Sequence, residues 1–249
     1  AEHNVTTEAV VPSAEGQDSV VKDASEGEDA LQVTRGPGGE AKCLPTQFTE
    51  FVYESDFDTN GVIYYLGSRG TGSFENPMEN GENVIVSVSS EYSTKYKLSK
   101  LVSRDKSGYM STGPDPGWMQ IDLGERRAMR VTCYTVRAGS ARSCFMRNWQ
   151  LLGSMDGESW DVVAEHVDDG RLCYHDGKPE DYGWETASWH SEPESDAKLH
   201  KGEPGAHHFT PSKDNFYRFW RIYSTGPCSN NYRRLEVCGM EFYGTLGED

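Results

Sequence analysis

The sequence lacks long apolar runs and is poor in positive charge. No run approaches the roughly 20 apolar residues that a membrane-spanning helix needs, and the first residues lack the basic-then-apolar layout of a signal peptide. Only 24 Lys and Arg face 40 Asp and Glu, which gives a formal charge of −16. Such a chain repels a phosphate backbone or an anionic membrane surface. The sequence therefore predicts a soluble protein that binds neither nucleic acid nor membrane.

Cysteine is sparse and scattered, without a Cys-x-x-Cys pair. The six residues are Cys43, Cys133, Cys144, Cys173, Cys228 and Cys238. This spacing is unlike the dense frameworks of small secreted domains, so we expect reduced thiols in a cytoplasmic protein. The alternative is a secreted or organellar protein after processing, with disulfides and an occupied glycosylation sequon at Asn4.

Recognisable catalytic motifs are also missing. The chain contains no Gly-x-Ser-x-Gly elbow, His-Glu-x-x-His helix, phosphate loop or dinucleotide fingerprint. Histidines gather late in the chain near Cys173, but their spacing matches none of the usual zinc patterns. We therefore expect a protein that is not an enzyme and has no cofactor other than a possible structural calcium ion.

Two regions differ in composition. Residues 1–44 mix acidic and small polar residues without a helical or strand period, so we expect a disordered acidic tail. Residues 45–249 alternate short β-rich runs with turn residues, which is typical of an all-β sandwich or barrel. The expected strands are 51–53, 62–66, 84–88, 119–123, 129–136, 149–152, 161–165, 217–223 and 236–243.

Three local features refine this picture. Asp156-Gly157 between two apolar runs predicts a β-hairpin, and Lys97–Val102 predicts a short helix with Ser93 or Thr94 as its N-cap. Residues 167–210, rich in Gly, Asp, Glu and Pro, are interpreted as a long loop excursion from the sandwich.

Five motifs in order resemble the discoidin, or coagulation factor 5/8 type C, family. They are Trp118-Met-Gln-Ile-Asp-Leu-Gly124, Val131-Thr-Cys-Tyr-Thr-Val-Arg137, Arg147-Asn-Trp-Gln-Leu-Leu-Gly-Ser-Met-Asp-Gly-Glu-Ser-Trp160, Phe216-Tyr-Arg-Phe-Trp-Arg-Ile222 and Gly239-Met-Glu-Phe-Tyr-Gly244. The similarity extends over about 48–245. Within the family, the opening motif that begins at Phe51 resembles the intracellular subgroup found in HECT-type ubiquitin ligases and BTB-domain proteins.

The resemblance implies an antiparallel jelly-roll β-sandwich of the galactose-binding-like kind, whose loops at one end contact the ligand. In the intracellular subgroup the ligands are mostly proteins, so the first hypothesis is an interaction adaptor or structural subunit of a larger assembly, possibly related to a ubiquitin ligase. The alternative is a lectin-like module that binds galactose-type sugars.

Two groups of residues are candidates for a site at the loops. The basic group Arg137, Arg142, Arg147 and Asn148 could bind a partner carboxylate or sugar hydroxyls, or could brace its own loop. Of the tryptophans, those in the excursion, Trp184 and Trp189, are expected to be exposed contacts. Those in the strand motifs, Trp118, Trp149, Trp160 and Trp220, are expected in the core.

Two groups of oxygen-bearing residues are candidates for a calcium site. By position, the resemblance implies calcium ligands at Asp105, Ser111 or Thr112, and Glu241, although ion pairs would explain the carboxylates equally well. Residues 56–63 reproduce the start of an EF-hand loop, but its twelfth position is Gly67 instead of a bidentate carboxylate. We interpret this segment as an Asn-Gly turn that leads into a strand.

Overall fold

The computed structural model describes residues 45–106, 108–113, 116–139, 145–172, 186–191, 207–209 and 215–249. The predicted disordered tail, 1–44, lies outside the described residues. Within them, no helix is long and apolar enough to cross a membrane.

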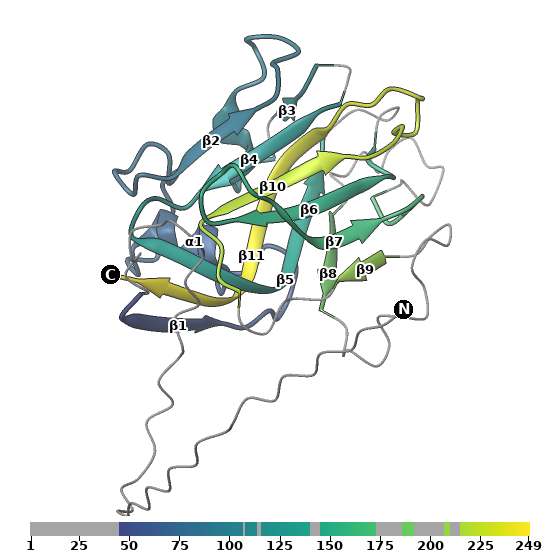
Figure 1. The fold of residues 1–249 in the computed structure, drawn as a ribbon. Coiled ribbons are helices and arrows are strands. Elements are labelled where there is room, and N and C mark those ends of the chain that lie inside the picture. Colours follow the sequence, from purple (N-terminus) through teal and green to yellow (C-terminus); the bar gives the residue numbers. More distant parts are fainter. Residues whose placement is uncertain are drawn as a thin grey trace, which may run out of the picture. The chain divides into compact units, whose positions relative to one another are not determined.

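The fold is the predicted sandwich of two antiparallel sheets (Figure 1). Sheet A has the order β1-β11-β5-β8, with β3 also paired to β11, and sheet B has the order β2-β4-β10-β6-β7-β9. The strands of sheet A are β1 (Gln47–Phe51), β3 (Met110–Ser111), β5 (Arg127–Ala138), β8 (Thr186–His190) and β11 (Glu236–Glu248). The strands of sheet B are β2 (Ile85–Val88), β4 (Trp118–Asp122), β6 (Trp149–Ser154), β7 (Asp161–His166), β9 (His207–Phe209) and β10 (Phe219–Ser224).

The core lies between the two sheets because alternate residues of each strand point inward. In β10, for example, Trp220 and Ile222 are buried, whereas Phe219 and Arg221 are partly exposed. Trp149 and Trp220 lie in the core as predicted. The same prediction is wrong for Trp118 and Trp160, which are partly exposed.

The segment after the first strand differs from the prediction. Val62–Ser68 forms a helix, α1, where a strand was expected. Its N-terminal amide groups are bound by the buried carboxylate of Glu241, which lies far along the chain in β11. This tertiary contact overrides the β propensity of a short run that contains Val62 and Ile63. The turn before it is organised by Asp58, whose carboxylate accepts backbone N–H groups of nearby residues.

The predicted hairpin and short helix are confirmed. Strands β6 and β7 pair antiparallel around Gly157, whose φ of 77° is the left-handed conformation that glycine favours. Leu98–Val102 forms a 3-10 helix, η1. Its N-cap is Lys97, without a side-chain cap hydrogen bond, so the expected Ser93 or Thr94 cap is wrong.

The excursion at 167–210 is more than a loop. It contributes β8, which pairs with β5 at the edge of sheet A, and β9, which pairs with β7 at the edge of sheet B. One inserted segment therefore extends both sheets.

Candidate functional site

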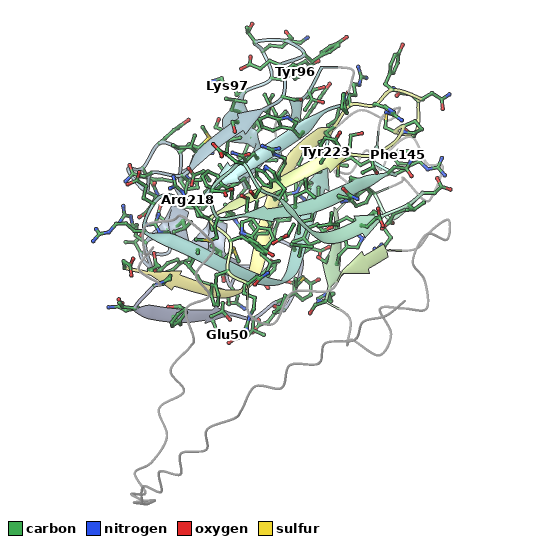
Figure 2. All side chains as sticks on the ribbon, viewed as in Figure 1. Glu50, Tyr96, Lys97, Phe145, Arg218 and Tyr223 are labelled. Carbon is green, nitrogen blue, oxygen red and sulfur yellow. The ribbon has the colours of Figure 1, made fainter. Side chains whose placement is uncertain are left out.

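Four segments meet at the end of the sandwich where β2 and β10 finish and β6 and β11 begin. We call residues 89–97, 112–113, 116–117, 145–148 and 225–235 the loop end. Backbone hydrogen bonds join them: Gly113 donates to Ser90, Gly117 to Arg233, Thr225 to Asn148, and Ser229 to Phe145. The loops therefore form one continuous surface, on which Tyr96, Lys97 and Phe145 lie (Figure 2).

A cation lies between two exposed tyrosines at the loop end. The Arg234 guanidinium carbon is 5.2 Å from the ring centroid of Tyr92 and 5.3 Å from that of Tyr232. These rings are 54% and 56% exposed. The Nη2 atom of Arg234 lies 3.0 Å from Oε1 of Glu236, which fixes the orientation of the guanidinium. The arrangement offers a hydrogen-bonding cation between two apolar ring surfaces.

Glu236, the partner of Arg234, is the buried member of this cluster. The side chain is almost completely buried, and its second carboxylate oxygen, Oε2, has no hydrogen-bond partner among the residues that the structure describes. Burial raises the pKa of Glu236 to about 7, although the charge of Arg234 acts in the opposite direction. A buried acceptor without a donor is costly in a folded protein.

Two more tyrosines extend the aromatic surface. The rings of Tyr96 and Tyr109 lie 4.8 Å apart, and the Tyr109 hydroxyl donates to that of Tyr96 over 3.3 Å. Burial raises the pKa of Tyr109, so its hydroxyl stays protonated at neutral pH. The loop end therefore combines the rings of Tyr92, Tyr96 and Tyr232 with the guanidinium of Arg234, and the ring of Tyr109 packs against that of Tyr96.

The predicted basic group is partly internal. The guanidinium of Arg137 is buried, stacks 3.8 Å from the ring centroid of Phe57, and donates to the carbonyl oxygen of Arg104. Burial lowers the pKa of Arg137. Arg147, by contrast, is half exposed and pairs with Asp168 at the surface. Of these two arginines, Arg147 is thus the one within reach of a ligand.

Asn148 joins two loops by hydrogen bonds. Its side-chain amide donates to the carbonyl oxygen of Pro227 over 2.9 Å, and its oxygen accepts the backbone N–H of Asp168 over 2.9 Å. These bonds favour the bracing interpretation. Arg142 and Trp184 lie outside the described residues.

The expectation that Trp189 is exposed is wrong. It is fully buried on β8, because the excursion returns to sheet A as a strand and places this side chain in the core. Its indole N–H donates to Oδ2 of Asp169 over 2.9 Å. The tryptophan is therefore part of the core and not a contact for a ligand.

Asp169 belongs to a buried polar network that sequence reasoning missed. Its Oδ2 atom lies 3.0 Å from Nδ1 of His166, whose other ring nitrogen is bonded to the Tyr134 hydroxyl. Arg171 closes the network with an ion pair to Asp169 at 2.7 Å. Burial raises the pKa of Asp169, but the hydrogen bonds from His166 and Arg171 outweigh it and hold the pKa well below its usual range.

This hydroxyl, imidazole and carboxylate are connected in the order of a catalytic triad, but they are excluded from solvent. Tyr134 and His166 are fully buried, and the imidazole stacks on Trp149 with ring centroids 4.1 Å apart. A substrate could not reach the hydroxyl, so the network is structural. The sequence signal was weak: only the i, i+3 spacing of His166 and Asp169 where the excursion begins.

The structure does not bring the three predicted calcium ligands together. Ser111 pairs in register with Glu236, five residues before Glu241 on β11, which corresponds to roughly 16 Å along a strand. The exposed carboxylate of Asp105 pairs with Lys100 at 2.6 Å. The ion-pair alternative therefore explains Asp105.

Glu241 is also fully occupied. Its carboxylate accepts the backbone N–H of Ile63 over 2.6 Å and of Tyr64 over 3.1 Å, and it pairs with Arg104 at 3.2 Å. Burial raises the pKa of Glu241 to about 7, against the lowering effect of these donors. Among the described residues, no group of three or more His, Cys, Asp and Glu side chains could hold a metal ion.

Comparisons with known proteins are consistent with this architecture. Residues 85–193 match the sequence model of the F5/8 type C domain. A BTB/POZ domain-containing protein of Arabidopsis thaliana is 28% identical over 208 residues, covering 80% of this chain and 22% of that protein.

Two ubiquitin ligases are also similar. The E3 ubiquitin-protein ligase Ufd4 of Drosophila melanogaster is 31% identical over 204 residues, covering 80% of this chain and 6% of the ligase. The E3 ubiquitin-protein ligase hecd-1 of Caenorhabditis elegans is 32% identical over 204 residues, covering 79% of this chain and 7% of the ligase. The chain thus spans less than a quarter of the length of these relatives.

Solved structures with a similar fold include sugar-binding modules of Clostridium perfringens. One is CpGH89CBM32-5 in complex with GalNAc-β-1,3-galactose, with a TM-score of 0.44, 10% identity, and coverage of 65% of this chain and 95% of that one. Another is the family 32 CBM from NanJ in complex with galactose, with a TM-score of 0.43, 10% identity, and coverage of 64% and 93%.

Proposed function

Because the chain carries a domain of the F5/8 type C family, we propose that it is a non-catalytic binding module whose loop end docks another protein. The observation that carries this proposal is the pair of exposed tyrosines, Tyr92 and Tyr232, on either side of the oriented Arg234. Tyrosine and arginine are the residue types that dominate protein interfaces, because they combine a large contact area with polar groups.

The relatives support an adaptor role. Three proteins of at least 28% identity are named as a BTB/POZ domain protein and two E3 ubiquitin-protein ligases. A module of this kind would act as an adaptor or structural subunit in a larger cytoplasmic assembly related to ubiquitin ligation. The buried free thiols Cys133 and Cys238 support a reducing compartment.

A second candidate function is carbohydrate binding. Exposed tyrosine rings can stack on a sugar, and the Arg234 guanidinium beside them could donate hydrogen bonds to neighbouring hydroxyl groups. We place it second because Arg234 already uses Glu236 as its partner. No cofactor enters either proposal, and a calcium titration followed by thermal unfolding tests that point.

The test is quantitative affinity purification of the full chain from its native source. We expect stoichiometric protein partners that disappear from the double variant Tyr92→Ser, Tyr232→Ser and from Arg142→Glu. Glu50→Lys is the matched control, because Glu50 is exposed on β1, away from the loop end (Figure 2).

A monomer without partners would contradict the adaptor role, and so would partners retained by both the double tyrosine variant and Arg142→Glu. In the first case, a glycan array probed with the same proteins would examine the second candidate. Loss of glycan binding from the double tyrosine variant would support a lectin-like site.

A further inference from the structure

The outer face of sheet B, which points away from the core, carries exposed apolar side chains. Outward positions of an antiparallel sheet that faces water are usually polar. Here they carry Ile85 on β2 and Val162 on β7, both 56% exposed. Between them lie partly exposed aromatic residues, including Phe219 and Tyr223 on β10, the latter labelled in Figure 2. The same face also carries the hydrogen-bonded pair Gln150 and Glu165. Exposed apolar side chains gathered on one face of a sheet can mark an interaction site.

A cation stands at the centre of this face. The guanidinium carbon of Arg221 lies 4.2 Å from the ring centroid of Trp118 and 3.8 Å from that of Trp160. Gln120, its register partner on β4, accepts hydrogen bonds from Nε over 3.2 Å and from Nη2 over 2.7 Å. The two rings and the amide hold the guanidinium in one orientation.

Among the residues that the structure describes, Arg221 has no anionic partner. Arg218, three residues earlier on the chain, forms a bidentate pair with Asp122 at 2.6 and 2.7 Å. Within the described ranges, no carboxylate pairs with Arg221, and burial is the one influence that lowers its pKa. The chain has a net charge of −16, so a guanidinium in a fixed orientation that pairs with none of the described carboxylates stands out from the rest of the surface.

We propose that this surface, the Trp118–Arg221–Trp160 face, docks an extended peptide segment of a partner protein that presents a carboxylate between apolar side chains. A carboxylate suits a guanidinium held in one plane, because both of its oxygens can accept hydrogen bonds. The apolar neighbours of that carboxylate would pack on the exposed side chains of Ile85 and Val162, on opposite sides of the cation.

A saccharide fits this face less well. Each of the two indole rings already has Arg221 against one side, which reduces the surface on which a sugar could stack. A nucleic acid is disfavoured by the overall negative charge. The face lies in the middle of sheet B and shares no side chain with the tyrosine cluster of the loop end, so it is a second surface, independent of the first.

The test uses the full chain and a displayed library of ten-residue peptides with one fixed Asp among random positions. We expect enriched peptides with apolar residues beside the Asp. Their binding, measured by titration calorimetry, should weaken at least tenfold with Arg221→Gln. Arg221→Glu should restore binding of the same peptide when its Asp is replaced by Lys. Arg126→Gln, a matched change of an exposed arginine in the turn before β5, is the control and should leave the affinity unchanged.

Two further variants distinguish a loss of binding from a loss of the folded structure. Ile85→Glu and Val162→Glu alter exposed side chains and should each repel the acidic peptide, while thermal unfolding stays as in the parent chain. The proposal is overturned if no peptide is enriched, or if enriched peptides bind Arg221→Gln and the parent equally. It is also overturned if a glycan array, and not the peptides, shows binding that depends on Arg221.

Discussion

Replacing Asp169 by Asn is expected to destabilise the fold strongly, because it removes the acceptor at the centre of the buried network. Oδ2 of Asp169 accepts hydrogen bonds from Nδ1 of His166, Nε1 of Trp189 and Nη2 of Arg171. The amide of Asn can present its oxygen on one side only. If its NH₂ group takes the Oδ2 position, His166 and Trp189 lose their acceptor. In the other orientation, the NH₂ group meets the backbone N–H and Nε of Arg171, which Oδ1 now accepts, so two donors lose an acceptor in either case.

The magnitude follows from those two donors. A buried donor left without a partner costs about 1–3 kcal/mol, and removal of one member of a buried ion pair costs about 3–5 kcal/mol. We therefore expect Asp169→Asn to lower the free energy of unfolding by about 4 kcal/mol. Urea unfolding at pH 7, followed by circular dichroism and tryptophan fluorescence, measures this difference.

The neighbouring residue supplies the control. Asp168 pairs with Arg147 at the surface, where the two side chains are 43% and 39% exposed. Asp168→Asn should therefore cost less than about 1 kcal/mol. The reasoning is refuted if the two variants lose similar stability, or if Asp169→Asn loses less than about 1 kcal/mol. Hydrogen exchange should also show faster exchange in β8, which Trp189 anchors to the network.

The same group gives a signed pH dependence. The pKa of Asp169 is lowered in the folded state, so its contribution is present above the ordinary Asp pKa of about 3.9 and is lost as the pH falls further. The stability curves of the parent chain and of Asp169→Asn should therefore converge in acid. Parallel curves from pH 7 down to acid unfolding would contradict this assignment.

Three further predictions concern single residues. Burial raises the pKa of Glu236 to about 7, so the folded state favours the protonated form. The stability that this form contributes is fully present below the ordinary Glu pKa of about 4.3 and is lost as the pH rises through 7. Glu236→Gln should therefore flatten the loss of stability that urea unfolding measures between about pH 5 and 8. Gly153→Ala places a methyl group 2.4 Å from the Tyr217 ring, so it should cost about 1–3 kcal/mol by thermal unfolding unless that ring can move. Burial raises the pKa of the Cys133 thiol to about 12, so it should resist labelling by a thiol reagent at pH 8 until the chain is unfolded in urea.

The sequence predicted the sandwich well because its strands follow an alternating pattern set by local burial. The run Trp149–Leu152 and the Asp156-Gly157 turn contain enough local information to specify a hairpin. Segments stabilised by distant residues were predicted less well. The run beginning at Val62 reads as a strand, but Glu241, which lies 178 residues from Ile63, binds the amide groups of a helix there.

The candidate site was predicted only in outline, for the same reason. Arg147 and Asn148, which the sequence singled out, lie at the loop end, and their role in binding stays a prediction. The cluster of Tyr92, Arg234 and Tyr232, however, joins residues about 140 positions apart, and no local pattern places them together. Trp189 was misplaced because a strand inside a polar excursion leaves a weak periodic signal.

The pairing of β1 with β11 has a consequence for engineering. Gln47 lies opposite Glu248, and the backbone N–H of Thr46 donates to the side chain of Asp249 over 3.1 Å. The two ends of the sandwich thus leave it at the same place, about one strand spacing apart, roughly 5 Å. A linker of a few residues could close them into a ring, and the chain could be reopened at another surface turn to give a circular permutant. For the same reason, the sandwich could be inserted into a surface loop of a host protein without separating the two sides of that loop.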